Sequence, residues 1–276
     1  MTRRIWVLTT FLLHRLFFSL TGVIFVIIAL VYWAVLFPPQ QGTPDLENYF
    51  LIVGAFGAGM TFLVALSIAS RANEAANYPL VVRLPSRVEF LTAVLLSTIV
   101  GAGLLQLLVA ALALFRGPTE LWPRIMEIPP VWLATNILAA VLAMHASDFV
   151  TAGWSRVYVF GLLAFLLLGQ SSSTTLAPWL AMRLNNLSAN FVQQGWYDIA
   201  NFINKAVSWL NIGGGEKLAD AMGFLFWPFR AINEAVLAGS FDANQALAPA
   251  VMLLYATILF MLAADLFANK DLDFIE

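Results

Sequence analysis

The sequence FLIVGAFGAGMTFLVALSIAS (residues 50–70) is followed at once by RANEAANYPLVVRLPSRVE (residues 71–89), and this pair sets the architecture. The first segment matches the length of about 20 mainly apolar residues that a helix needs to cross a bilayer. The second is polar, and a further apolar run, Phe90–Phe115, follows it. Prolines at Pro79 and Pro85 prevent one continuous helix across the polar segment. The sequence therefore predicts two membrane spans joined by a short loop that holds a surface helix and a sharp re-entry.

Composition indicates that lipid covers much of the surface. The chain has 276 residues, of which 61% are hydrophobic and 11% are charged, and its mean hydropathy is +0.84. A soluble domain carries about 25% charged residues. The net charge of −2 gives no basis for a nucleic-acid partner. The absence of cysteine excludes disulfides, iron–sulfur clusters and thiol chemistry.

Apolar length predicts an all-α polytopic membrane protein with six transmembrane helices in a single domain, residues 1–276. The predicted spans are Leu16–Phe37, Phe50–Ser70, Phe90–Phe115, Val131–Thr151, Val157–Leu176 and Leu247–Ala268. The first run is too long for a signal-peptide core, so we expect it to be retained as a span. Short loops carry most of their Lys and Arg on the side of the N-terminus, including Arg71, Arg83 and Arg87. This pattern predicts that both termini are cytoplasmic.

Two further segments read as amphipathic. Residues 2–15 combine apolar and basic side chains, which predicts a short helix on the cytoplasmic leaflet. In residues 177–245, apolar side chains recur at helical spacing and four tryptophans occur, so we expect helices lying on or dipping into the outer leaflet. The apolar stripe consists of Val192, Trp196, Ile199, Ile203, Ala206 and Leu210. We expect Gly213–Gly215 to end this helix and Trp227–Pro228 to interrupt the next. A cap packed on the other helices is the alternative for this region.

Catalytic chemistry finds little support in the residues. His14 and His145 are the only histidines, and neither lies in a ligand motif for haem, pigment or metal, so packed or interfacial roles are favoured over ligation. Asp148 is the one carboxylate well inside the predicted fourth span, and an ion pair with Arg156 at the membrane surface is its simplest interpretation. Gly213–Lys217 lacks the Gly-Lys-Ser/Thr ending of a phosphate loop. We therefore predict no enzyme activity, no bound cofactor and no metal.

Small and polar residues inside the spans predict helix packing. The second span carries small residues at spacings that allow close helix approach. These residues are Gly54, Ala55, Gly57, Ala58 and Gly59. Gln106 and Asn136 are candidate intramembrane polar residues, which either line a polar vestibule or hydrogen-bond between helices.

The layout and two short motifs resemble the membrane subunits (permeases) of type-2 ABC transporters, the six-span exporter-like group. In that family, the loop between spans two and three typically has a glutamate and then a proline-containing turn that ends in Ser-Arg. Glu74 and Leu84-Pro85-Ser86-Arg87 occupy those places here, and Phe267–Leu272 is similar to the family's charged tail. The chain departs from the pattern at Ala75 and at Ala93-Val94-Leu95, where the family often has basic residues.

The resemblance implies a permease in a bacterial plasma (inner) membrane, which pairs with a second permease protomer as a homodimer or heterodimer. A separate soluble ATP-binding subunit would bind the ATP and contact the loop. The implied contact residues are Glu74, Tyr78, Arg83, Pro85, Ser86 and Arg87. Two alternatives stay open: a permease-like, non-transporting structural subunit of a larger membrane complex, and a membrane enzyme acting on lipid. Neither the substrate nor the direction of transport follows from the sequence.

Overall fold

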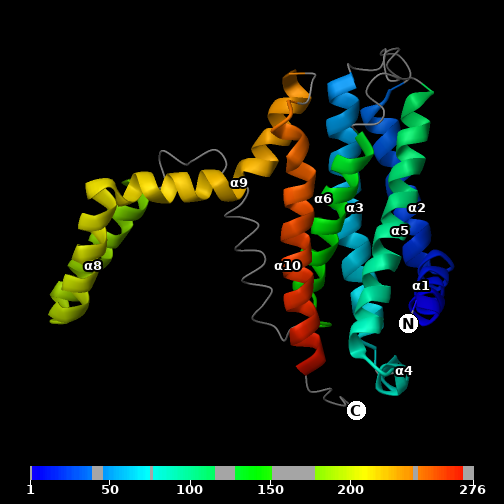
Figure 1. Ribbon diagram of the computed structural model, residues 1–276, viewed down its shortest axis with the longest axis horizontal. Coiled ribbons are helices and arrows are strands. Elements are labelled where there is room, and N and C mark those ends of the chain that lie inside the picture. The colour runs from blue at the N-terminus through cyan, green and yellow to red at the C-terminus, as the bar shows by residue number, and fades with distance from the viewer. Residues whose placement is uncertain are drawn as a thin grey trace. The chain divides into compact units, whose positions relative to one another are not determined.

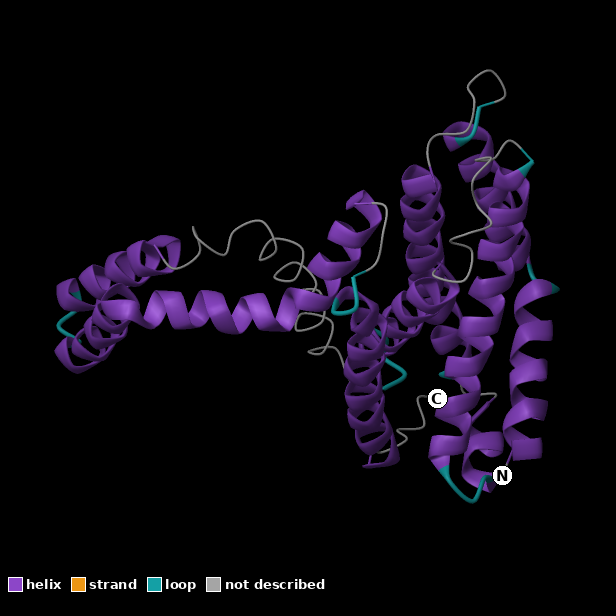
Figure 2. Cartoon of the chain, turned by 45° about the horizontal axis from the view of Figure 1, so that its top comes forward, coloured by secondary structure: helices purple, strands orange, loops and turns teal. Residues whose placement is uncertain are grey.

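The protein is described by a computed structural model that covers residues 2–38, 46–74, 77–115, 128–150, 178–238 and 242–269. These residues form helices joined by turns and include no strand (Figure 2). By its internal contacts the chain divides into two compact units, Met1–Phe160 with Ile232–Glu276, and Gly161–Ala231.

The first unit is a helical bundle (Figure 1). Its helices are α1 (Thr2–Phe17), α2 (Leu20–Leu36), α3 (Leu46–Ala72), α4 (Tyr78–Arg83), α5 (Arg87–Leu114), α6 (Ile128–His145) and α10 (Ala248–Asn269). Helix α3 packs against α5 and α6, α6 also packs against α10, and both α1 and α2 pack against α5. Helices α1 and α4 and the last turn of α10 lie at one end of this bundle.

The long helices have the character of membrane spans. Four of them, α3, α5, α6 and the helix over residues 245–269, are long and apolar enough to cross a bilayer, and α1 with α2 forms a bent candidate for a fifth. Their outward side chains are also apolar, as with Leu104 and Leu107 on α5 and Ile258 on α10. Such helices suit a lipid surround rather than water. The protein is therefore an integral membrane protein, and the predicted spans over residues 50–70, 90–115 and 247–268 are confirmed as helices.

The predicted first span, residues 16–37, was placed too early at its N-terminal end, because the chain bends after α1 and α2 begins at Leu20. Ser19 has extended backbone angles and caps α2 by accepting a hydrogen bond from the Gly22 amide. The axes of α1 and α2 differ by 72° at this elbow. A Cβ atom on Gly22 would overlap the Leu16 carbonyl oxygen, so the bend requires glycine at this position.

The predicted fourth span, residues 131–151, is shifted along the chain. Helix α6 begins at Ile128 and carries Pro129 and Pro130 in its first turn, where a missing amide hydrogen costs no helical hydrogen bond. It ends at His145, and turns follow over residues 146–150. Phe149 in these turns lies between Phe90 and Phe267, with ring centroids 5.9 and 4.6 Å away. This aromatic contact holds the chain that leaves α6 against α5 and α10. The predicted fifth span, residues 157–176, lies outside the described residues.

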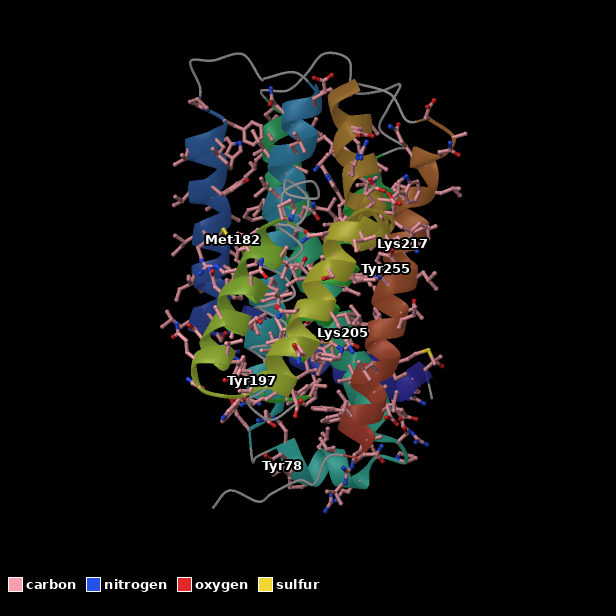
Figure 3. All side chains as sticks on the ribbon, turned by 90° about the vertical axis from the view of Figure 1, so that its left-hand side faces the viewer. Tyr78, Met182, Tyr197, Lys205, Lys217 and Tyr255 are labelled. Carbon is pink, nitrogen blue, oxygen red and sulfur yellow. The ribbon has the colours of Figure 1, made fainter. Side chains whose placement is uncertain are left out.

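The second unit contains a helix over residues 178–193, followed by α8 (Tyr197–Trp209) and most of α9 (Gly215–Ala238). The first two helices lie side by side, and the Ser188 hydroxyl donates to the Ala200 carbonyl at 3.3 Å (Figure 3, where Met182 and Lys205 mark the two). The predicted single stripe from Val192 to Leu210 is wrong, because Gly195 has a φ of +79° and turns the chain between two helices. The predicted break at Gly213–Gly215 is confirmed by a φ of +98° at Gly213.

The predicted interruption at Trp227–Pro228 is also wrong, since α9 continues through Pro228. A proline removes one backbone hydrogen bond and distorts a helix without having to end it. Large apolar side chains point outward in this unit, including Trp196, Phe202, which is 75% exposed, and Ile212. Whether they meet lipid or protein stays a prediction.

Candidate functional site

The loop between α3 and α5 owes its shape to local rules. Leu84 precedes Pro85 and has extended angles (φ −77°, ψ 141°), so α4 ends at Arg83. Ser86 then caps α5, because its hydroxyl accepts a hydrogen bond from the Val88 amide at 3.3 Å. A short helix thus stands between the ends of the two longest apolar helices. This outcome agrees with the surface helix and sharp re-entry predicted from the prolines.

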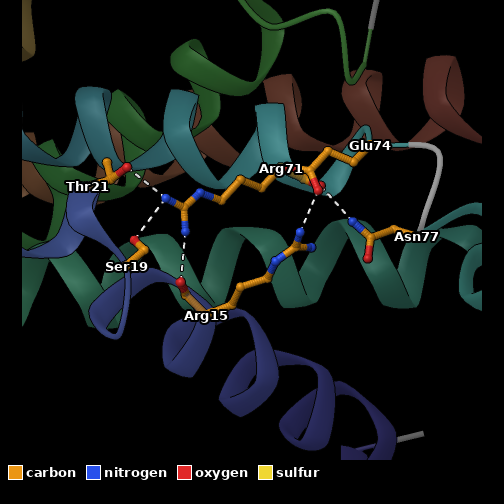
Figure 4. Close-up of polar contacts among 6 residues, drawn as sticks. All are labelled: Arg15, Ser19, Thr21, Arg71, Glu74 and Asn77. Atoms are coloured by element: carbon orange, nitrogen blue, oxygen red, sulfur yellow. Dashed lines mark hydrogen bonds and ion pairs between the residues drawn. The ribbon is translucent and has the colours of Figure 1, made fainter.

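Arg71, in the last turn of α3, fastens the loop to the elbow between α1 and α2 (Figure 4). One guanidinium nitrogen donates to the Arg15 carbonyl at 2.8 Å, and the other donates to the hydroxyls of Ser19 and Thr21 at 2.9 and 2.7 Å. Hydrogen bonds from a charged donor are among the stronger ones in proteins. The cation also lies near the C-terminus of α1, where the helix dipole favours positive charge.

Two further contacts hold the start of the loop. The Arg15 guanidinium pairs with the Glu74 carboxylate, and the Asn77 side-chain amide donates to the Arg71 carbonyl at 2.6 Å. The Arg15–Glu74 pair is about half exposed, so it contributes at most about 1 kcal/mol. Its main effect is on position, because it links α1 to the residues that lead into α4.

Helix α4 presents different sides to the bundle and to solvent. Val81 is 2% exposed and packs inward, whereas Val82 is 61% exposed. Arg83 and Pro85 are also exposed, and Tyr78 is half-buried. The exposed side of α4 therefore combines an apolar side chain with a cation, a composition suited to contact with another molecule.

The other predicted contact residues have structural partners. Glu74 pairs with Arg15, and Ser86 serves as the cap of α5. Arg87 is half-buried and donates to the Ala268 carbonyl at 3.4 Å, which joins the start of α5 to the end of α10. Lysine and arginine at such a position compensate the free carbonyls of a helix end.

Glu89, in the first turn of α5, is a buried carboxylate that sequence reasoning did not single out. It is 5% exposed, and its Oε2 atom has no hydrogen bond among the described residues. The Arg4 guanidinium on α1 lies 3.9 Å from this atom. A buried carboxylate beside a cation holds the two helices in register, because separation would leave the charge uncompensated.

A polar cluster joins α3, α5 and α6 within the bundle. Gln106 donates to the Val53 carbonyl at 3.1 Å, and its side-chain oxygen accepts a hydrogen bond from the Asn136 amide at 2.6 Å. The Gln106 amide lies against Gly57, where a Cβ atom would overlap it. Of the two roles predicted for Gln106 and Asn136, these contacts correspond to hydrogen bonding between helices.

The predicted packing residues on α3 divide between two environments. Gly54 faces Trp132, and a Cβ atom there would lie 3.0 Å from the indole nitrogen. Ala58 is half-buried, whereas Ala55 and Gly59 are exposed, and nothing lies within 4 Å of a Cβ built on Gly59. Gly57 is the residue that permits close approach inside the bundle.

The two histidines and Asp148, which was predicted to lie inside the fourth span, show no arrangement specific to a ligand or proton site in the part of the chain that the structure describes. His14 stacks on Phe18 with a centroid distance of 4.3 Å, and His145 Nε2 lies 2.8 Å from the Leu259 carbonyl, to which it must donate. Asp148 lies exposed in the turns after α6 and is not within a helix. Its predicted partner Arg156 lies outside the described residues. Within the described ranges, no group of three or more His, Asp or Glu side chains is arranged to hold a metal ion.

Comparisons with known protein families, characterised proteins and solved structures give no match for this chain. Function therefore has to be argued from the membrane bundle and from the anchored helix α4.

Proposed function

We propose that this chain is the permease subunit of a type-2 ABC transporter in a bacterial plasma membrane, with both termini cytoplasmic. Its loop 71–89 would couple it to a separate ATP-binding subunit. The observation that carries the proposal is helix α4, a short helix with an exposed side that is firmly tied to the ends of longer helices. ATP binding and hydrolysis belong to the partner, so this chain is not an enzyme and needs no cofactor of its own.

The chemistry of α4 suits a protein contact. Tyr78 and Val82 lie one turn apart, and Val82 is largely exposed next to the cation of Arg83. Stable interfaces commonly have an apolar or aromatic centre and a polar rim. A cleft on the ATP-binding subunit would receive this side of α4, which Glu74 precedes and Arg87 follows in the sequence.

The anchoring contacts would make such a dock mechanically useful. A displacement of α4 would be transmitted through Asn77 to the Arg71 carbonyl. The Arg71 side chain would then transmit it to the elbow between α1 and α2. Packed helices respond to a displacement by changing between discrete arrangements rather than by continuous bending. Closure of the partner subunits would thereby alter a pathway between two permease protomers.

The exposed small residues of α3 support a surface for the second protomer. Ala55 and Gly59 lie one turn apart, and the space beside Gly59 is open. Small residues allow the backbones of two membrane helices to approach closely, where van der Waals contact drives association. We infer that this side of α3 meets a second permease chain or packs in lipid when the chain is alone.

The test compares two single substitutions. Val82→Glu puts a charge on the proposed contact, and Phe202→Glu makes the same kind of change at an exposed apolar residue of α8. Tagged proteins are purified in mild detergent at physiological salt, and everything that stays attached is identified by mass spectrometry. We expect a soluble ATP-binding subunit in near-equal amount with the native chain and with Phe202→Glu, and its loss with Val82→Glu. Retention of that subunit by Val82→Glu would show that α4 is not the dock.

A second candidate function is a non-transporting structural subunit of a larger membrane complex. The exposed aromatic and aliphatic side chains of the second unit favour it, among them Trp196, Phe202 and Ile212. Contiguous exposed apolar surface marks contacts with protein or lipid. In the same purification, integral membrane subunits without an ATP-binding protein would select this function over transport.

A further inference from the structure

A cavity of about 690 Å³ lies between the N-terminal turns of α1 and the loop that contains α4. Its basic lining consists of Arg3 and Arg4 from α1 and Arg83 from α4. Its apolar lining includes Val7, Leu80 and Leu84. A cavity of this size is typical of sites that enclose a small molecule or part of a larger one.

The cavity carries a surplus of positive charge. Arg4 has the buried Glu89 carboxylate at 3.9 Å, which compensates one guanidinium in part. Arg3 and Arg83 have no acidic partner among the described residues. Two guanidinium groups without an acidic partner in the described ranges favour a bound anion in the cavity that they share, and their planar donor sets match phosphate oxygens.

The same cavity borders a surface that suits a membrane interface. Trp6 on α1 is 66% exposed, and Val7 and Phe11 on the same helix are exposed as well. Tryptophan and basic side chains on an amphipathic helix favour the boundary between lipid head groups and acyl chains. An occupant that joins a phosphate to an apolar chain would satisfy both parts of the lining.

We propose that this cavity binds an anionic phospholipid, with the phosphate between Arg3 and Arg83 and an acyl chain along Val7, Leu80 and Leu84. The site adjoins the proposed partner contact: Arg83 belongs to both, whereas Tyr78 and Val82 are not among the residues that line the cavity. A bound lipid would fill the space between α1 and α4 and reinforce the link between them. An acidic protein segment satisfies the charge but not the apolar lining, so the lipid is favoured.

The experiment uses the full purified chain in neutral detergent with no partner protein present, so it does not depend on transport. Dioleoylphosphatidylglycerol and dioleoylphosphatidylcholine are titrated separately, and bound lipid is counted by native mass spectrometry. Each basic residue near an anionic lipid is worth about five-fold in binding. We expect Arg3→Gln with Arg83→Gln to bind phosphatidylglycerol about 25-fold more weakly and to leave phosphatidylcholine binding unchanged.

The control removes the same amount of charge elsewhere. Lys205→Gln with Lys217→Gln changes two exposed cations of the second unit and should bind phosphatidylglycerol as the native chain does. A photoactivatable phosphatidylglycerol provides a second measurement on the native chain, which holds even if the arginine variants fail to fold. We expect its label on peptides that contain residues 3–8 and 79–84.

Four results would overturn the proposal. Equal binding of the two lipids by the native chain would remove the preference for negative charge. Equal phosphatidylglycerol binding by the arginine variant and the lysine control, or label outside residues 3–8 and 79–84, would remove the site. Tighter binding of a hexaglutamate peptide than of phosphatidylglycerol, again dependent on Arg3 and Arg83, would make the cavity a protein dock instead.

Discussion

Gly57→Ala should destabilise the bundle strongly, although it adds a single methyl group. The added Cβ atom would overlap the amide of Gln106, which hydrogen-bonds to the Val53 carbonyl and to Asn136. Gln106 is buried and lies in the middle of α5, so its side chain has little room to move. The substitution therefore forces the amide away from both partners or pushes α3 away from α5.

The magnitude follows from three contributions. Loss of two hydrogen bonds between membrane helices costs about 0.6–2 kcal/mol each. Strain from the extra atom in a packed core costs about 1–3 kcal/mol. Replacing glycine by alanine in a helix opposes these losses, because it stabilises the helix by up to about 1 kcal/mol. We expect the free energy of unfolding to fall by about 3 kcal/mol.

The assay is reversible unfolding in mixed micelles with increasing dodecyl sulfate, followed by tryptophan fluorescence. Trp132 is a suitable reporter, since its ring lies 6.0 Å from that of Phe50 and its indole donates to the Phe50 carbonyl. Gly59→Ala is the matched control on the same helix, because nothing lies within 4 Å of its added Cβ atom. It should leave stability unchanged or raise it by up to about 1 kcal/mol.

A double-mutant cycle isolates the cause. In a Gln106→Ala background the obstacle is absent, so Gly57→Ala should be neutral or slightly stabilising, which gives a coupling energy of about 3 kcal/mol. If Gly57→Ala is as stable as Gly59→Ala, or is equally damaging with and without Gln106, then the close contact between α3 and α5 is not what glycine permits at this position.

Three other predictions concern the end of the bundle that carries α4. Arg71→Lys should lower the free energy of unfolding by about 2 kcal/mol, because one ammonium group cannot reproduce the guanidinium's three separate hydrogen bonds. Arg4→Gln should destabilise the protein by more than Glu89→Gln does, since only the first leaves a buried carboxylate without its cation; equal losses in the same unfolding assay would contradict this. Val82→Cys should react with an impermeant maleimide only after cells are permeabilised, whereas Leu247→Cys should react in intact cells if its end of α10 is external. The chain has no native cysteine to interfere.

Apolar length was sufficient to predict most of the bundle. The helices α3, α5 and α10 follow from long apolar runs bounded by polar residues. The elbow at Ser19 was missed, because Leu16–Phe37 is apolar throughout except at Ser19 and Thr21, and a hydroxyl inside such a run often bonds its own helix. The end of α6 was missed because Asp148 was interpreted as a carboxylate inside the span, whereas the chain leaves the helix after His145 and contacts of Phe149 with α5 and α10 hold the turns that follow.

The sequence predicted the helix and turn of the loop between α3 and α5 but not the contacts that hold this loop. Prolines at both ends of α4 predicted a short helix and a re-entry, which the structure has. The network around Arg71 joins residues 50 to 56 positions apart, so no local pattern contains it. Glu89 was not singled out from the sequence, and it is buried because α1 packs across α5.

The distribution of polar contacts indicates how the bundle would respond to a load on α4. Polar joints connect the ends of helices: Arg71 ties α3 to the elbow of α1 and α2, and Arg87 ties α5 to α10. Between the ends the contacts are largely apolar, and apolar contact is not directional. Directional bonds fix positions, whereas apolar surfaces tolerate small sliding movements. A displacement of α4 is therefore expected to tilt whole helices about their jointed ends, and hydrogen bonds that cross between helices within the bundle oppose sliding. Among these bonds, those of Gln106 and Asn136 join three helices, α3, α5 and α6. For a transporter, that cluster would be the pivot of the motion; for a structural subunit, it would be one of the contacts that prevent it.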